Sequence, residues 1–307
     1  MKRIITVLLS FVMCLCFSSS AMATDLISAE DKIRMTVYSP DFPDAYIIQN
    51  EANEEVKSSS TKSVSATVFV EEEYGLDRNG EPVTISSKLL SESEVRAIGI
   101  DNFGTIEDAR EKAVNKALQT GRSSSARGTL DLFFWGIYST SGNSVSCDLS
   151  GSASWSAGPG LFNGSTNPAD GSDYMGVVWS GGFECSNSSI DSTSSIPIYE
   201  PPVLNMCAAK PNAGRVWEFT EAWAESMMGQ GVSVYLTNID VDVTITKANM
   251  TGGGNYAEAQ LKYIHTYSSV SGSISISASS SGISGGFSLS NVQNQWSLVC
   301  TVSGIPY

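Results

Sequence analysis

The sequence predicts a mainly β fold, an antiparallel sandwich or barrel-like arrangement, with a small N-terminal α+β part. Three observations support this fold class. From Tyr263 to the C-terminus the chain contains no Asp, Glu, Lys or Arg. Between Gly231 and Tyr307, apolar residues alternate with serine and threonine, as in strands that have one face on a core and one in water. Short segments of this kind, separated by turns rich in Gly and Ser, are typical of sandwiches and barrels.

The first residues have the features of a secretory signal peptide. Two basic residues precede an apolar run at residues 4–17, and residues 21–23 (Ala-Met-Ala) form a small-x-small cleavage site. We therefore expect the protein to be secreted and extracellular, with cleavage after Ala23. Cys14 and Cys16 raise the alternative of a lipoprotein anchor, but the bulky residues just before them fit that processing poorly.

Composition divides the remaining chain into three regions. Residues 24–62 are polar and acidic and are expected to form an N-terminal arm or a pro-segment, with short strands at Lys32–Tyr38 and Ala45–Gln49. Residues 63–125 are expected to form a small α+β region. Residues 126–307, rich in serine, glycine and aromatic side chains, are expected to form a β domain.

The clearest helix covers Ile106–Thr120, where apolar residues recur at helical spacing. Thr105 is a suitable N-cap, acidic residues occupy the first turn, and Gly121 stands in the usual C′ position. A shorter helix is expected at Ser91–Ile98. Val216–Met228 suits either a helix or a strand, and the glycine that follows it favours a helix.

Two strands are expected near the middle of the chain. Leu130–Tyr138 is apolar on both faces and predicts a central strand that is covered on both sides. Ser144–Ala157 shows the most regular alternation, with Cys147 and Trp155 on its apolar face and mainly serine on the other.

Four cysteines follow the signal peptide, and an even number in an exported chain suggests two disulfides. The segment around Cys147 resembles the segment around Cys300, as two neighbouring strands of the same pattern would. We therefore expect the pairs Cys147–Cys300 and Cys185–Cys207. The CxxC spacing of a structural zinc site is missing.

The formal net charge is −14 at pH 7, and it would be −16 without the two basic residues of the signal peptide. Binding to nucleic acid or to anionic lipid headgroups depends on Lys and Arg, so this charge argues against both partners. Phosphate-binding loops of the GxxxxGK[ST] and GxGxxG kinds are missing, and we expect no cofactor.

Catalytic motifs are weak throughout the chain. Zinc hydrolases usually need two or more histidines, and His265 is the only one. It shares a strand face with Leu261 and Tyr263, so we expect it to be half-buried and hydrogen-bonded. Residues 282–286 match GxSxG, but no acid or histidine follows Ser284 in the order that a nucleophile elbow requires.

Carboxylates leave two further possibilities. A pair of acids within residues 148–225 could serve a glycan hydrolase, although the sequence places no two of them together. Asp170 and Asp173 are candidate calcium ligands, but they lack the fuller spacing of a dedicated loop. An ordinary turn explains them better.

All six tryptophans lie from Trp135 onward, and an exposed indole ring offers a flat apolar surface with one donor on which a sugar can stack. Trp155 and Trp296 alternate in phase with cysteines and are expected to face inward. The remaining candidates for ligand binding are Trp179, Trp217 and Trp223, although packing in the core is the favoured interpretation for them too.

The uncharged Ser/Ile segment Gly272–Ser290 has three interpretations: a half-buried strand pair, a surface for a partner, or an amphipathic hairpin that enters a bilayer. We expect a non-catalytic binding or surface-interaction protein, with a glycan, cell wall or cell surface as partner. The alternatives are a membrane-active, pore-forming-like protein and a carboxylate-dependent glycan hydrolase.

Overall fold

The structure is a computed structural model that describes residues 34–51, 61–103, 106–156, 172–227, 229–249, 254–267 and 272–307. Antiparallel strands dominate these residues, and only two α-helices occur among them, so the predicted mainly β fold is confirmed. The expected signal peptide and its cleavage site lie outside the described residues.

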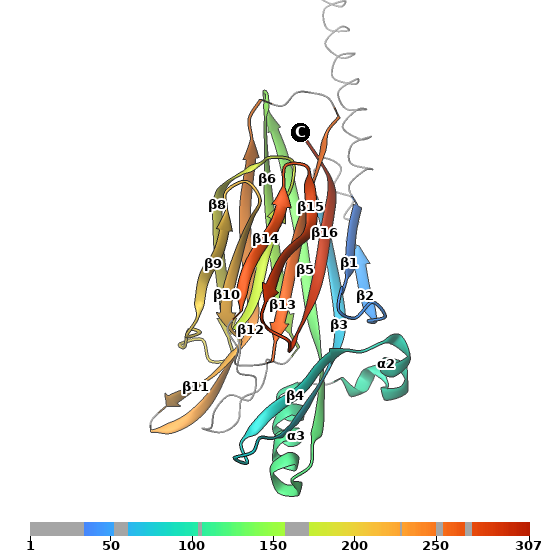
Figure 1. The fold of residues 1–307 in the computed structure, drawn as a ribbon, viewed down its shortest axis with the longest axis vertical. Coiled ribbons are helices and arrows are strands. Elements are labelled where there is room, and N and C mark those ends of the chain that lie inside the picture. The colour runs from blue at the N-terminus through green and yellow to red at the C-terminus, as the bar shows by residue number, and fades with distance from the viewer. Residues whose placement is uncertain are drawn as a thin grey trace, which may run out of the picture.

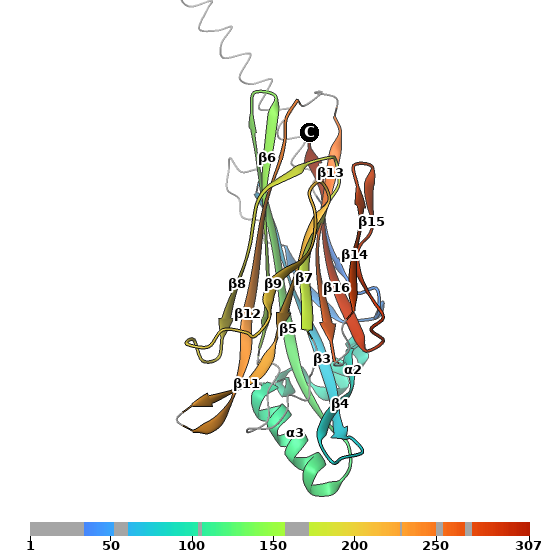
Figure 2. The same ribbon diagram turned by 60° about the vertical axis from the view of Figure 1, so that its left-hand side comes forward.

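Two sheets are stacked face to face along the length of the molecule (Figures 1 and 2). The six-stranded sheet contains, in order, β1 (Arg34–Tyr38), β16 (Gln295–Pro306), β13 (Tyr256–Thr266), β7 (Ser172–Trp179), β10 (Gly214–Thr220) and β9 (Leu204–Lys210). The eight-stranded sheet contains β11 (Ala222–Met227), β12 (Gln230–Lys247), β6 (Ser144–Trp155), β5 (Ser124–Ser141), β3 (Thr61–Leu76) and β2 (Ile47–Glu51), with β8 (Glu184–Ser194) paired to β12 and β4 (Pro82–Leu89) paired to β3.

The space between the two sheets is filled by aromatic and branched side chains. Its largest fully buried members include Trp179, Trp217, Trp296, Tyr263, Phe134, Phe183 and Phe219. Close approach of the sheets needs a small residue on one of them. A Cβ on Gly151 of β6 would lie 2.5 Å from Leu261 Cδ1 of β13, so glycine at this position lets the sheets meet.

A third layer lies on the outer face of the six-stranded sheet. It is a hairpin of β14 (Ser273–Ser279) and β15 (Gly282–Ser290), which pair only with each other (Figure 2). Its apolar side chains form a second core with residues of β7, β10 and β13; this core contains Tyr174, Val178, Val216, Ile264, Ala278, Phe287 and Leu289. The serines of both hairpin strands point to solvent.

Two helices gather at one end of the molecule (Figure 1). The predicted helix at residues 106–120 is present as α3 (Ile106–Thr120), which packs through Ala113 and Val114 against Tyr74 and Ala126. The shorter helix α2 (Glu92–Ile98) begins with a capping box between Ser91 and Glu94. Neither of these helices has the length and apolar character needed to cross a bilayer, and the same holds for every described helix.

The expected helix at 216–228 is wrong. β10 ends at Thr220, and Ala222–Met227 pairs as β11 with residues 230–235 of β12. Gly229 has φ +81°, so this glycine makes the turn of a β-hairpin and does not end a helix.

The compositional regions do not coincide with the sheets. β1 pairs with β16, and β2 pairs with β3, so residues 34–51 are part of both sheets and do not form a separate arm. β3 pairs with β5 from Thr61–Ile137 to Tyr74–Ser124, which joins the two sides of the expected boundary near residue 126 in one sheet. The composition of a segment reflects the chemistry of the surface that it presents, whereas strand pairing joins segments that are far apart in the sequence.

The expected disulfides are also absent, since all four described cysteines are free thiols. β6, which carries Cys147, neighbours β5 and β12, whereas β16, which carries Cys300, neighbours β1 and β13. The two thiols therefore face the core from opposite sheets, which stack about 10 Å apart, while a disulfide requires Cα atoms within about 7 Å. Cys185 and Cys207 lie on edge strands of different sheets.

Candidate functional site: a buried acid–histidine cluster

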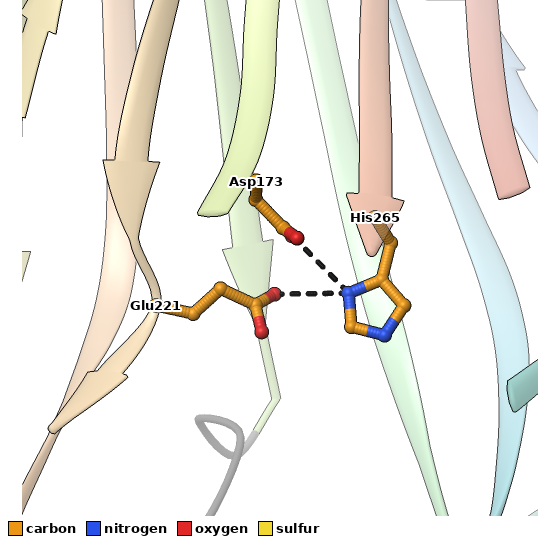
Figure 3. Close-up of side chains that lie close together, drawn as sticks. All are labelled: Asp173, Glu221 and His265. Atoms are coloured by element: carbon orange, nitrogen blue, oxygen red, sulfur yellow. Dashed lines mark hydrogen bonds and ion pairs between the residues drawn. The ribbon is translucent and has the colours of Figure 1, made fainter. Parts of the chain in front are cut away.

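Three buried ionisable side chains meet at the end of the core where β7 begins and β10 and β13 end: Asp173, Glu221 and His265 (Figure 3). Strand register brings them together. Ile264 of β13 pairs with Tyr174 of β7, so the next residue along β13, His265, reaches the level of Asp173. β10 pairs with the other side of β7 and ends one residue before Glu221.

The imidazole of His265 contacts both sheets. Its Nδ1 atom lies 3.1 Å from Asp173 Oδ2 and 3.1 Å from Glu221 Oε1. Its Nε2 atom lies 3.3 Å from Oε1 of Glu72, which belongs to β3 of the facing sheet. The other carboxylate oxygen of Glu72 accepts a hydrogen bond from the hydroxyl of Tyr74. All these side chains are buried.

Neighbouring donors support the carboxylates. The hydroxyl of Tyr263 donates to Asp173 Oδ2 and lies 3.0 Å from Glu221 Oε1, and it accepts a hydrogen bond of 3.2 Å from Trp155 Nε1. The backbone N–H of Thr266 donates to Asp173 Oδ1 over 2.8 Å. The rings of Trp155 and Trp296 lie 5.5 Å and 5.0 Å from the imidazole.

Burial and mutual charge shift the ionisation of the cluster. Burial raises the pKa of Asp173 well above its usual value, and the neighbouring charge of Glu221 raises it further. Burial lowers the pKa of His265, but the charges and hydrogen bonds of Asp173 and Glu221 outweigh this and raise the pKa well above its usual value. The cluster therefore needs positive charge, from a proton or a cation, to remain buried.

A small pocket adjoins the cluster. It is lined by Ala153, Trp155, Phe219, Glu221, Leu236, Asn238, Ile239 and Tyr263. Its volume of about 10 Å³ is enough for roughly one water molecule. Because this pocket is far smaller than a sugar, the cluster suits an internal polar centre or an ion site better than a hydrolase site.

The structure shows where the candidate site residues from the sequence analysis lie. Trp179, Trp217 and Trp223 are 0, 2 and 5% exposed, so all three pack in the core and present no free ring to a ligand. Of the two calcium candidates, Asp173 lies in the buried cluster, and Asp170 lies outside the described residues. For the expected pair of acids within residues 148–225, the described part of the chain places Asp173 and Glu221 together beside His265.

His265 was expected to be half-buried, but it is fully buried. Its partners could have been anticipated in part from alternation. Val64, Ala66, Val68 and Val70 share one face of β3, and the same phase places Glu72 on that core face. Glu221 gave no such signal, because it lies at the junction of two strands in a segment that also suited a helix.

Comparison with known proteins gives no family. No family model matches the chain, and no curated protein matches it. Among solved structures, the C-terminal domain of the Streptococcus agalactiae AgI/II polypeptide BspA is 10% identical, with 71% of this chain and 95% of that chain covered and a TM-score of 0.23. The N-terminal domain of the Streptococcus gordonii adhesin Sgo0707 is 9% identical, with 82% and 65% covered and a TM-score of 0.24. A pore-forming protein is 8% identical, with 83% and 90% covered and a TM-score of 0.23. Likenesses this weak carry no argument about function.

The hydroxyl of Tyr263 is expected to stabilise the fold through the cluster. Tyr263→Phe removes the donor shared by two buried carboxylates and should lower the free energy of unfolding by about 1–3 kcal/mol in urea titrations. Tyr38→Phe is the control, because Tyr38 is 45% exposed, and should stay within about 0.5 kcal/mol of wild type. Equal effects of the two changes would contradict the network described above.

Proposed function

We propose that this protein is an exported, non-catalytic binding protein that recognises a neutral glycan of a cell wall or cell surface through the outer face of its eight-stranded sheet. The observation that supports this proposal is an apolar row on β5. Phe133, Trp135 and Ile137 point away from the core, and Phe133 and Ile137 remain 37% and 36% exposed. The sequence predicted a strand covered on both faces, yet the outer row of this strand is open to solvent.

Hydroxyl groups flank the apolar row on both sides. Strand register places serines directly opposite its two rings: Ser65 and Ser152 beside Phe133, and Ser63 and Ser150 beside Trp135. Asp240 and Asp242 of β12 pair with the serines of β6 and extend the polar border. The face thus offers flat apolar rings between rows of hydrogen-bonding groups.

This arrangement suits a sugar chain. A pyranose ring has an apolar C–H face that can stack on an aromatic ring, and its hydroxyls can bond to serine and carboxylate oxygens at the edge. Alternate residues of a strand are about 6.6–6.8 Å apart, so the row forms a linear platform for an extended polymer. The net charge of −14 disfavours nucleic acids and anionic lipids as competing partners.

The aromatic rings should carry most of the binding energy. Phe133→Ala combined with Trp135→Ala should weaken binding to cell-wall polysaccharide at least about 10-fold, a loss of about 1.4 kcal/mol, in co-sedimentation and titration calorimetry. Ile85→Ala is the matched control, since Ile85 is 50% exposed on β4, and it should bind like wild type.

Two results would contradict the glycan proposal. One is a wild-type protein that binds no polysaccharide at millimolar ligand. The other is sedimentation showing that the wild-type protein dimerises and that the double variant does not, because the row would then serve a second copy of the chain.

A second candidate function, membrane activity, is favoured by the position of the β14–β15 hairpin. In the sequence, the hairpin lies between β13 and β16. These two strands pair directly with each other, in register from Ala259–Val302 to Thr266–Gln295. Each hairpin strand therefore continues a strand of the sheet, folded back on its outer face. Away from the sheet, the hairpin would have an apolar face opposite a serine face, the alternation of strands in membrane barrels.

A disulfide that holds the hairpin in place tests this candidate. A Cβ on Gly182 would lie 3.6 Å from Cβ of Ser280 at the hairpin turn, within the range of a disulfide. If the hairpin enters bilayers, Gly182→Cys with Ser280→Cys, in a Cys185→Ser background, should abolish dye release from phosphatidylcholine vesicles until a reductant is added. Ser280→Cys alone and Gly182→Cys alone in the same background are the controls, the second because Gly182 has φ +69° and any side chain there is strained. Absence of dye release by the wild-type protein over a range of pH and lipid composition would exclude the candidate.

A further inference from the structure

We infer that Asp173, Glu221 and His265 form a binding site for one divalent transition-metal ion in the core of the protein. One imidazole nitrogen and two carboxylate oxygens converge there, with Nδ1 at 3.1 Å from each oxygen. Ligands of a tetrahedral ion lie about 2.0–2.2 Å from the metal and therefore about 3.3 Å from one another. Small outward movements of three side chains would thus accommodate the ion.

Without an ion, the facing oxygens and Nδ1 have too few hydrogens to share unless one carboxyl group retains a proton, as the raised pKa of Asp173 allows. Nδ1 of a histidine carries at most one hydrogen, yet two carboxylate oxygens face it at the same distance. The hydroxyl of Tyr263 also has one hydrogen and faces the same two oxygens. A cation between the oxygens and Nδ1 would satisfy all three atoms at once and would offset the buried negative charge.

The surroundings orient the ligands as metal sites require. A histidine that binds metal through one nitrogen usually donates the hydrogen of the other nitrogen to a carboxylate. Here Nε2 lies 3.3 Å from Glu72 Oε1 as an ion-pair contact, which favours the tautomer with its hydrogen on Nε2 and the lone pair of Nδ1 facing Asp173 and Glu221. The second oxygen of Asp173 is held by the backbone N–H of Thr266. These outer contacts favour that tautomer and orient the carboxylate of Asp173.

The donor set indicates the class of ion. Imidazole suits zinc and other first-row transition metals, whereas calcium and magnesium prefer shells made of oxygen alone. Further coordination is available from the hydroxyl of Tyr263 or from a water in the adjoining pocket, which Glu221 and Tyr263 both line. Because the ligands come from β7, β13 and the β10–β11 junction, the ion would tie these segments together as a structural site.

Metal content and thermal stability test the site directly. The full chain, refolded with Zn²⁺ or Mn²⁺ and dialysed against metal-free buffer, should retain about one ion per chain by mass spectrometry. Refolding with a chelator should lower Tm by at least about 5 °C, and adding back the ion should restore it. Cobalt substitution should give the visible absorption bands of a low-coordinate Co²⁺ site.

Charge-removing variants identify the ligands. Asp173→Asn and Glu221→Gln should each lower metal retention at least about 10-fold, and Glu218→Gln, three residues away on β10, should retain the ion like wild type. The inference is overturned if the refolded wild-type protein holds neither ion and its Tm is insensitive to both, or if Glu221→Gln retains a full equivalent. Where a variant fails to fold, the wild-type metal content and cobalt spectrum decide.

Discussion

The alignment of the two sheets depends most on one set of buried polar contacts, the clamp that Glu72, Asp173 and Glu221 form on the His265 imidazole. One ring nitrogen faces Glu72 of the eight-stranded sheet, and the other faces Asp173 and Glu221 on the side of the six-stranded sheet. Apolar side chains tolerate small shifts between stacked sheets, but buried charges do not, because an unpartnered charge in a dry core is costly. The clamp therefore sets how the two sheets are aligned, while the aromatic side chains around it supply most of the stabilising burial.

The outer faces of the sandwich differ in chemistry, and this difference separates the two candidate functions. The six-stranded sheet is covered by a hairpin whose exposed side chains are hydroxyls. Beneath the hairpin, the ammonium group of Lys262 is buried and donates to the carbonyl of Phe287 over 2.9 Å. The eight-stranded sheet instead keeps an aromatic row partly open to water. This row has no part in the core, and the glycan-binding proposal rests on it.

Sequence patterns were reliable where the relevant interaction is local. Helical spacing and a glycine at C′ located α3, and alternation of serine with apolar residues located the strands of the C-terminal part. Where the outcome depends on non-local pairing, they failed. The residues from Ala222 to Met227 form a strand because β12 offers an edge. The similar segments around Cys147 and Cys300 lie in different sheets. Alternation predicts which side chains of a strand face the core, but it does not predict which strand pairs with it.

The cluster itself could be predicted only in part. The alternation in β3 and β13 extends to Glu72 and His265 and places both on core faces, but it says nothing of which strands face each other. Only the register of β7 with β13 and β10 brings Asp173 and Glu221 to the imidazole. The tryptophans show a second limit of prediction from sequence, because composition cannot distinguish an indole ring that fills the core from one that binds a ligand.

Because His265 is the only histidine of the chain, nitrogen-15 NMR of its imidazole reports on the clamp without ambiguity. The structure predicts a ring Nε2–H that is buried, faces Glu72 and exchanges slowly with solvent across the range in which histidine normally titrates. An imidazole that exchanges freely and titrates near its ordinary pKa of about 6.5 would contradict the clamp, and with it the alignment of the two sheets described here.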